Sequence, residues 1–193
     1  MNKRILLAGL LGGLALFLWE FVAHEVLPLG EAGIRALPDE ARVQAVIKQA
    51  VKDPAFYYFP APQFQPGMTS EQQRQAMEKS MQRAATEPTG MMIVYPQGRP
   101  FSFGGSLVIQ FVTDVAVMLL CAALLSCASL AGYLTRVGFV TAMGLIPSMR
   151  VDLPYWNWYG WPTPYLAAQV TVHVVGFCMG GLILARLVKA GPK

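Results

Sequence analysis

Residues 5–27 read ILLAGLLGGLALFLWEFVAHEVL, and this apolar stretch decides the fold of the chain. A hydrocarbon core of about 30 Å requires roughly 20 apolar residues at 1.5 Å each, and the stretch supplies them directly after Lys3 and Arg4. A cleaved secretory signal also begins with basic residues and an apolar run, but the small residues of a cleavage site are missing after this one. We therefore expect a retained transmembrane helix over residues 1–28.

Three further apolar runs follow, at residues 106–125, 129–146 and 165–187. Only 13% of the residues are charged and 54% are hydrophobic, whereas an average soluble domain has roughly 25% charged residues. These features predict an all-α membrane protein with four transmembrane helices, the last three within residues 105–193. The third helix is expected to be short, tilted or re-entrant, because Arg136 interrupts it and Pro147 ends it.

The short segments at one end of these runs are basic and contain no acidic residue. Their charges are Lys3, Arg4, Arg136, Arg186, Lys189 and Lys193. Basic flanking residues favour the cytoplasmic side of a membrane, so both termini are expected in the cytoplasm. Residues 29–104 and an aromatic loop at residues 150–164 are then expected outside, which is the periplasm for a multi-pass protein of a bacterial inner membrane.

Residues 29–104 carry eight basic and seven acidic side chains, which is typical of a solvated folded surface. Apolar residues at helical spacing follow Pro38, and a second helix is expected from Thr69, which has capping-box spacing to Gln72. Residues 55–59 and 91–95 are aromatic or otherwise apolar, and Pro and Gly bound them, which predicts two strands. The segment should form a small α+β extramembrane cap, with two helices packed on a two-stranded ribbon.

Four ionisable residues stand out inside the predicted spans: Glu20, His24, Asp114 and His173. Each costs roughly 2.5–3.5 kcal/mol to insert at bilayer depth, so each needs a reason. Glu20 and His24 are four apart and share a helix face, and the other two lie at comparable depth. Such a set can bind zinc, iron or manganese, or can transfer protons. In the purely structural alternative, Glu20 pairs only with His24. Asp114 then neutralises Arg136, and His173 bonds a backbone carbonyl.

Two pairs of glycines have the spacing of close helix contacts. Gly9 and Gly13 lie in the first predicted helix, and Gly176 and Gly180 lie in the fourth. Small residues at this spacing allow two helix backbones to approach closely in a membrane. We expect the first and fourth helices to touch there, or one of the two faces to receive another subunit.

The loop at residues 150–164 concentrates aromatic side chains. They are Tyr155, Trp156, Trp158, Tyr159 and Trp161. Tryptophan and tyrosine favour the headgroup level of a bilayer, because each has an apolar ring and one polar group. The cluster is therefore interpreted as an interfacial anchor. Two functional alternatives are a docking surface for a partner subunit and a lid over a lipid or quinone-like ligand.

Two short motifs carry a resemblance to other proteins. Residues 27–33 read LPLGEAG, and residues 156–162 read WNWYGWP. Together with Trp19 and His24, they resemble a group of small bacterial inner-membrane proteins with no assigned function. The resemblance covers most of the chain, but it implies no catalytic residues or ligands.

Signatures of several common protein classes are missing from the sequence. There is no phosphate-binding glycine loop and no nucleophile elbow. Cys121, Cys127 and Cys178 lie in apolar runs and are expected to be buried, inert thiols. Nucleic acid is not an expected partner, because no basic cluster is interleaved with aromatic residues. The spacing of the polar residues matches no metal motif, and no cofactor is expected.

The leading hypothesis is a non-enzymatic accessory or scaffold subunit that packs against a larger membrane complex of the respiratory or photosynthetic type. Its expected partners are membrane lipids and other membrane protein subunits. The first alternative is a membrane-embedded enzyme or permease that handles a metal or protons through the four ionisable residues. The second alternative is a protein that binds lipid or quinone through the aromatic loop.

Overall fold

The computed structural model describes residues 3–189 and is mostly helical. The chain divides into two compact units. One contains residues 36–100, and the other joins the segments on either side of them. We call the second of these the helical unit.

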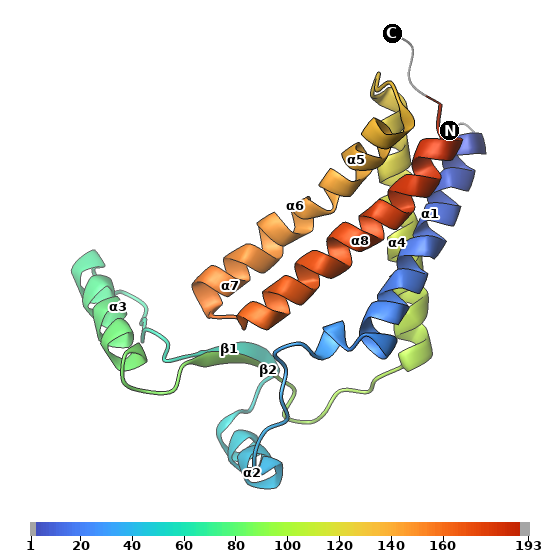
Figure 1. Ribbon diagram of the computed structural model, residues 1–193. Coiled ribbons are helices and arrows are strands. Elements are labelled where there is room, and N and C mark those ends of the chain that lie inside the picture. The colour runs from blue at the N-terminus through green and yellow to red at the C-terminus, as the bar shows by residue number, and fades with distance from the viewer. Residues whose placement is uncertain (1–2, 190–193) are drawn as a thin grey trace. The chain divides into compact units, whose positions relative to one another are not determined.

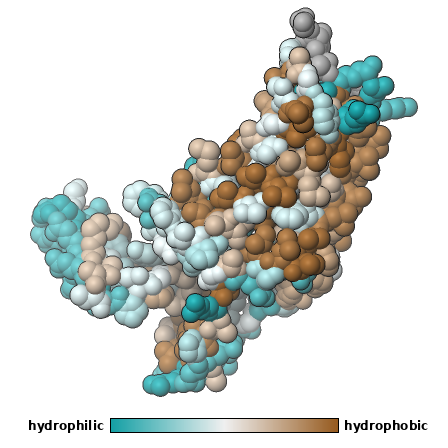
Figure 2. All heavy atoms as spheres, viewed as in Figure 1, coloured by the Kyte–Doolittle hydropathy of each residue, from teal (hydrophilic) through white to brown (hydrophobic). Residues whose placement is uncertain are grey.

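Three helices of the helical unit are long and apolar enough to cross a membrane: Lys3–Val26, Phe103–Cys127 and Thr163–Leu187. The first consists of α1 (Lys3–Phe21) and a π-helical turn (Val22–Val26), and the others are α4 (Phe103–Cys127) and α8 (Thr163–Leu187). Apolar side chains cover much of the face of this unit that Figure 2 shows. The hydropathy pattern therefore predicted the membrane class and these three helices.

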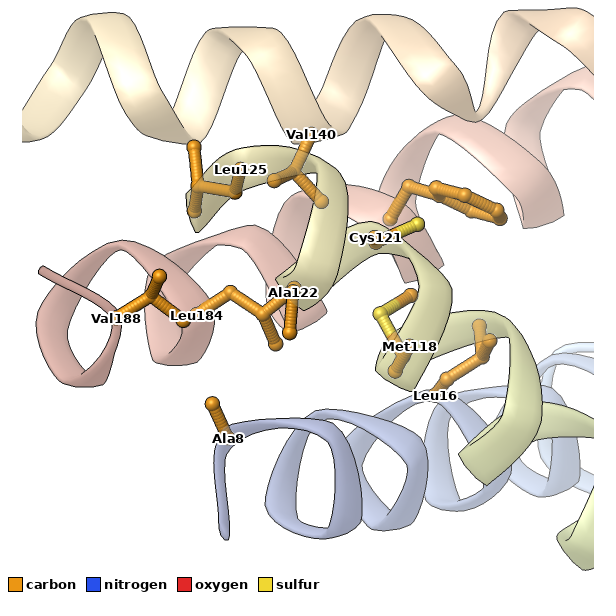
Figure 3. Close-up of a cluster of buried hydrophobic side chains, with 10 residues drawn as sticks. Ala8, Leu16, Met118, Cys121, Ala122, Leu125, Val140, Leu184 and Val188 are labelled. Carbon is orange, nitrogen blue, oxygen red and sulfur yellow. The ribbon is translucent and has the colours of Figure 1, made fainter. Parts of the chain in front are cut away.

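Helix α1 packs against both α4 and α8, and α5 (Tyr133–Met143) packs against the other side of α8 (Figure 1). A cluster of buried side chains joins the four helices (Figure 3). It consists of Ala8, Leu16, Met118, Cys121, Ala122, Leu125, Val140, Phe177, Leu184 and Val188. We call the end of the unit where α1 begins and α8 ends the basic end. The opposite end, where α8 begins, is the aromatic end.

The third predicted span is not one long helix. Instead, α5 is followed by α6 (Leu145–Pro147), a π-helical turn (Ser148–Asp152) and α7 (Leu153–Tyr159), which together form a segmented rod over residues 133–159 (Figure 1). The rod begins later than predicted, because Gly132 has φ of 85° and turns the chain. The residues between the helical segments retain helical backbone angles. Gly144 has φ and ψ of −65° and −16°, and Pro147 has φ and ψ of −60° and −42°.

The prediction of an aromatic loop at residues 150–164 is wrong for most of that segment. Residues 153–159 form α7, and a left-handed Gly160 ends the helix before α8 begins at Thr163. The reason lies at Pro154, which occupies the first turn of α7, where a missing N–H group costs little. The tryptophans and tyrosines therefore project from a helix end.

The unit of residues 36–100 contains α2 (Glu40–Ala50), β1 (Ala55–Phe59), α3 (Ser70–Ala84) and β2 (Gly90–Val94). The strands pair antiparallel, with Tyr57 opposite Met92, as the two apolar runs predicted. The capping box at the start of α3 is also confirmed: the Gln72 N–H donates to Thr69 Oγ1 at 3.3 Å, and the Thr69 N–H donates to Gln72 Oε1 at 2.8 Å.

The helices of this unit contribute little to a core. No residue of α2 is buried, and Ser80 is the only buried residue of α3. Its hydroxyl donates a hydrogen bond of 2.7 Å to the carbonyl of Pro60. Two helices packed on the ribbon were expected, and the small buried core fits the little apolar surface that about 65 residues supply.

Candidate functional site

The site lies along the interface between α1 and α4, whose backbones approach closely at two glycines. A Cβ atom added to Gly13 would lie 2.5 Å from Val115 Cα, and one added to Gly9 would lie 2.8 Å from Leu119 Cα. Only glycine allows this approach, because any side chain would overlap the facing backbone. The pairing is antiparallel, so residues that follow Gly13 in α1 face residues that precede Val115 in α4.

Two acidic side chains meet along this interface toward the aromatic end. Gln110 Nε2 donates a hydrogen bond of 2.6 Å to Glu20 Oε2 and another of 2.9 Å to Asp114 Oδ1. Gln110 and Asp114 are four residues apart, so both lie on the face of α4 that looks toward Glu20. One amide group therefore bridges a carboxyl group on each helix.

Asp114 is the most buried member of this set. The residue is 3% exposed and lies near the middle of α4. Its second oxygen, Oδ2, is buried and has no hydrogen-bond partner among the described residues. Within residues 3–189, none of the ion pairs involves Glu20 or Asp114. A buried carboxyl oxygen without a partner is costly, so this position calls for a further ligand or proton.

A cleft of about 260 Å³ at the aromatic end of the helical unit reaches the Glu20 carboxyl group and the Gln110 amide of this set. Glu20 and Gln110 line the cleft, together with His24 and Glu25 from the π-helical turn that follows α1. Four phenylalanines, Phe17, Phe21, Phe101 and Phe103, contribute apolar walls. The cleft thus combines acidic groups with aromatic surfaces.

His24 lies beside the carboxyl pair but does not bond its side chains. Its Nδ1 atom lies 2.8 Å from the backbone carbonyl oxygen of Glu20. The imidazole ring packs against Gly30, where a Cβ atom would overlap it. The predicted pair between the Glu20 and His24 side chains is therefore replaced by a side-chain to backbone contact.

His173 belongs to a second polar cluster, between α8 and the segmented rod. Its Nδ1 atom lies 2.9 Å from Ser148 Oγ and 3.3 Å from Asp152 Oδ2, and Ser148 and Asp152 are both buried. In a serine hydrolase, the serine and the carboxylate contact opposite nitrogens of the histidine. Here both contact the same nitrogen, so the cluster does not have the geometry of a nucleophilic relay.

The predicted four-residue cluster is thus divided between two interfaces. Glu20 and Asp114 come together, His24 lies next to them, and His173 faces the segmented rod. No group of three or more His, Cys, Asp or Glu residues suited to a metal occurs within residues 3–189. Arg136 does not neutralise Asp114, because its guanidinium donates to the Val188 carbonyl at the basic end.

Each of the four glycines that were predicted to pack helices together contacts another helix of the same chain. Gly9 and Gly13 face α4, whereas Gly176 faces Leu16 on α1 and Gly180 faces Met118 on α4. The first and fourth predicted helices, α1 and α8, do pack against each other. The glycine pair of α1, however, contacts α4 instead of α8.

The aromatic side chains near α7 divide into two groups. The Tyr155 ring centroid lies 5.2 Å from that of Tyr159 and 4.7 Å from that of Trp161, so these rings pack on one another. The indole N–H of Trp156 donates to Thr163 Oγ1 at 3.2 Å, and Trp158 is 75% exposed. Trp158 is therefore the ring most available to a membrane surface or a partner.

Sequence reasoning missed three residues of these clusters: Gln110, Ser148 and Asp152. Gln110 had a signal, since it is polar within an apolar run and lies four residues before Asp114. Asp152 lies in the segment that was expected to be a loop, and an acidic residue in a solvated loop indicates no special site.

Comparisons with known proteins give no relative for this chain. No family model matches it, and neither does any curated protein or solved structure. The functional argument therefore rests on the geometry of the residues alone.

Proposed function

We propose that this chain is a four-span membrane protein that takes up a positively charged ligand, either a proton or a cation, at Glu20 and Asp114. The observation that carries the proposal is the Gln110 amide, which bonds both carboxyl groups while Asp114 Oδ2 has no partner among the described residues.

The fourth crossing follows from the directions of the helices. Gly9 contacts Leu119 and Gly13 contacts Val115, so α4 runs opposite to α1. Trp19 Nε1 donates to the Val172 carbonyl and Gly176 contacts Leu16, so α8 also runs opposite to α1. Helices α4 and α8 are therefore parallel. If both cross a bilayer, the chain between them must return to the first side, and the segmented rod over residues 133–159 is the segment available for this crossing.

Labelling with a membrane-impermeant maleimide tests this topology. Cys127 was expected to be buried, but it is exposed at the end of α4. Asn157 lies in α7, near the end of the rod at the aromatic end. We expect reagent added outside intact cells to label Asn157→Cys in a Cys127→Ser background, and to leave Cys127 of the natural chain unlabelled until the cells are opened. Equal labelling of both positions from one side would contradict a crossing between them.

The positive ligand follows from charge. Two ionised carboxylates that share one neutral amide inside a bilayer would each pay a desolvation cost and would also repel each other. No basic side chain pairs with either carboxyl group within residues 3–189. A proton or a cation held between the two groups removes both costs. The pair therefore binds positive charge, and the cleft gives it access from the aromatic end.

A hydrophobic carbodiimide provides the test, because this reagent attacks carboxyl groups that hold a proton in apolar surroundings. We expect one adduct per chain, located by mass spectrometry at Glu20 or Asp114 of the protein in bilayers, and less adduct when a bound cation competes. The double variant Glu20→Gln/Asp114→Asn should lose the adduct, whereas Glu40→Gln, at the exposed start of α2, should retain it. Absence of an adduct at both residues of the natural chain, with and without added cations, would overturn the proposal.

A second candidate function is that of a subunit in a larger membrane assembly. One surface of the segmented rod supports it. An outward stripe on the rod contains Leu134, Gly138, Ala142, Leu145 and Met149, all exposed at helical spacing. Among the described residues, no atom lies within 4 Å of a Cβ atom built on Gly138. A small residue on an open face permits another helix to approach closely.

Mild-detergent purification from native membranes tests this candidate. Gly138→Leu should release a stoichiometric partner that the natural chain retains. Gly104→Leu is the matched control, because Gly104 in α4 is also open among the described residues. A natural chain that purifies as a monomer without a partner would count against a subunit role.

A further inference from the structure

We propose that the ligand of the Glu20 cleft is an alkylated ammonium group, which is a bulky organic cation and not a metal ion. The inference deepens the proposed function and rests on it, since it needs the carboxyl pair to bind positive charge.

The cleft combines exposed phenylalanine rings with acidic side chains. Phe21, Phe101 and Phe103 are exposed by 49%, 76% and 58%, and all three line the cleft with Glu20. Aromatic faces attract cations electrostatically, and quaternary ammonium groups are recognised mainly in this way. Glu25 adds a second carboxylate at the cleft. Acidic groups then provide the charge, and the rings provide a surface for alkyl substituents.

Inorganic cations fit this cleft less well. Calcium binds six to eight oxygen atoms, and magnesium demands a near-octahedral oxygen shell. The carboxyl and amide oxygens that line the cleft come from Glu20, Glu25 and Gln110, and no metal-binding group of three or more His, Cys, Asp or Glu occurs within residues 3–189. An alkylated ammonium group needs fewer oxygen contacts, because apolar walls solvate its substituents.

The volume sets the size of the ligand. At about 260 Å³, the cleft lies just below the roughly 300–1,000 Å³ of pockets for drug-sized molecules. A small tetraalkylammonium ion or the amine headgroup of a phospholipid has the required chemistry. The shared feature of these two sources is a cationic nitrogen that carries carbon substituents.

Equilibrium dialysis of radiolabelled tetraethylammonium against the full chain tests the inference. The protein is placed in nanodiscs that contain phosphatidylglycerol alone, so that no lipid amine competes. We expect saturable binding that Phe21→Leu and Phe103→Leu each weaken roughly 2- to 30-fold, the range for one cation–π contact. Both rings are exposed, so leucine keeps apolar contact without disturbing a core. Phe64→Leu, in the other unit, is the control and should not change binding.

A second set of nanodiscs distinguishes the two sources of the ammonium group. Phosphatidylethanolamine added to the bilayer should displace tetraethylammonium if a headgroup is the natural occupant, and native mass spectrometry should then detect retained lipid. Binding that is insensitive to this lipid identifies a soluble cation. Either result supports an ammonium ligand.

The carbodiimide result separates failure of this inference from failure of the proposed function. If Glu20 or Asp114 forms the adduct but tetraethylammonium does not bind, the pair carries a proton or an inorganic cation and the ammonium inference is overturned. Binding that the phenylalanine variants leave unchanged also overturns it, because the aromatic walls would play no part. If neither the adduct nor binding is observed, both proposals fail.

Discussion

Replacement of Gly13 by alanine tests the close packing on which the carboxyl site depends. The added methyl group would lie 2.5 Å from Val115 Cα and 2.7 Å from Val115 N, well inside van der Waals contact. Backbone atoms cannot rotate away as a flexible side chain does, so α1 and α4 must separate. Overpacking of this kind costs about 1–3 kcal/mol of the free energy of unfolding.

Gly138→Ala is the matched control for the cost of this clash. Both glycines lie inside helices, so alanine should add about 1 kcal/mol of helix propensity in each case. No described atom lies within 4 Å of the position of a Cβ atom on Gly138, so this variant gains stability without a clash. The difference between the two variants therefore isolates the overpacking cost of about 1–3 kcal/mol.

Equilibrium unfolding in mixed micelles measures this difference in the free energy of unfolding. Circular dichroism follows the loss of helix as the fraction of denaturing detergent rises. We expect Gly13→Ala to unfold at a lower fraction than the natural chain and Gly138→Ala at an equal or higher one. If the two variants unfold together, the close contact between Gly13 and Val115 would be refuted.

Two further predictions concern polar contacts. Replacement of His173 by leucine removes the imidazole that lies 3.3 Å from the buried Asp152 carboxyl group, and it should cost about 1–3 kcal/mol of the free energy of unfolding. A further Asp152→Leu change should restore part of this loss, and an equally unstable double variant would argue against the contact. Hydrogen bonds from Arg74 lower the pKa of the exposed Glu71 carboxyl, so its contribution to stability is complete above the pKa of the unfolded chain and is lost as the pH falls through the lowered folded value. An NMR titration should show a low midpoint for Glu71 that rises in Arg74→Gln, and an unchanged midpoint would contradict this.

Local patterns in the sequence predicted the elements that depend on neighbouring residues. The hydropathy of three long runs predicted α1, α4 and α8, because a helix in a bilayer needs only length and apolar side chains. The capping box of Thr69 and Gln72 predicted the start of α3, because both of its hydrogen bonds lie within one turn.

The segmented rod could not be predicted in the same way. Proline usually ends a helix, and Pro147 was expected to end the third span. In the structure, α8 packs against this segment, and Gly144 fits closely against Phe177. Packing thus maintains a helical path that local preferences alone would break, and it brings Asp152 to His173.

The partners of the polar residues likewise depended on packing. A sequence shows that Glu20, Asp114 and His173 are costly in a bilayer, but not which of them meet. Each residue turns the helix by about 100°, so a small change in the rotation of a helix redirects every side chain. The glycine contacts fix that rotation for α1 and α4, and they direct Glu20 toward Gln110.

The sequence by itself determined that this chain has helices able to span a membrane, and that a small two-stranded unit interrupts them. Both properties depend on residues close together in the chain, through hydropathy, turns and caps. Only the tertiary structure decided that Gln110 joins Glu20 to Asp114 and that His173 belongs to another interface. These pairings join residues far apart in the chain, and the close fit of helix against helix selects them.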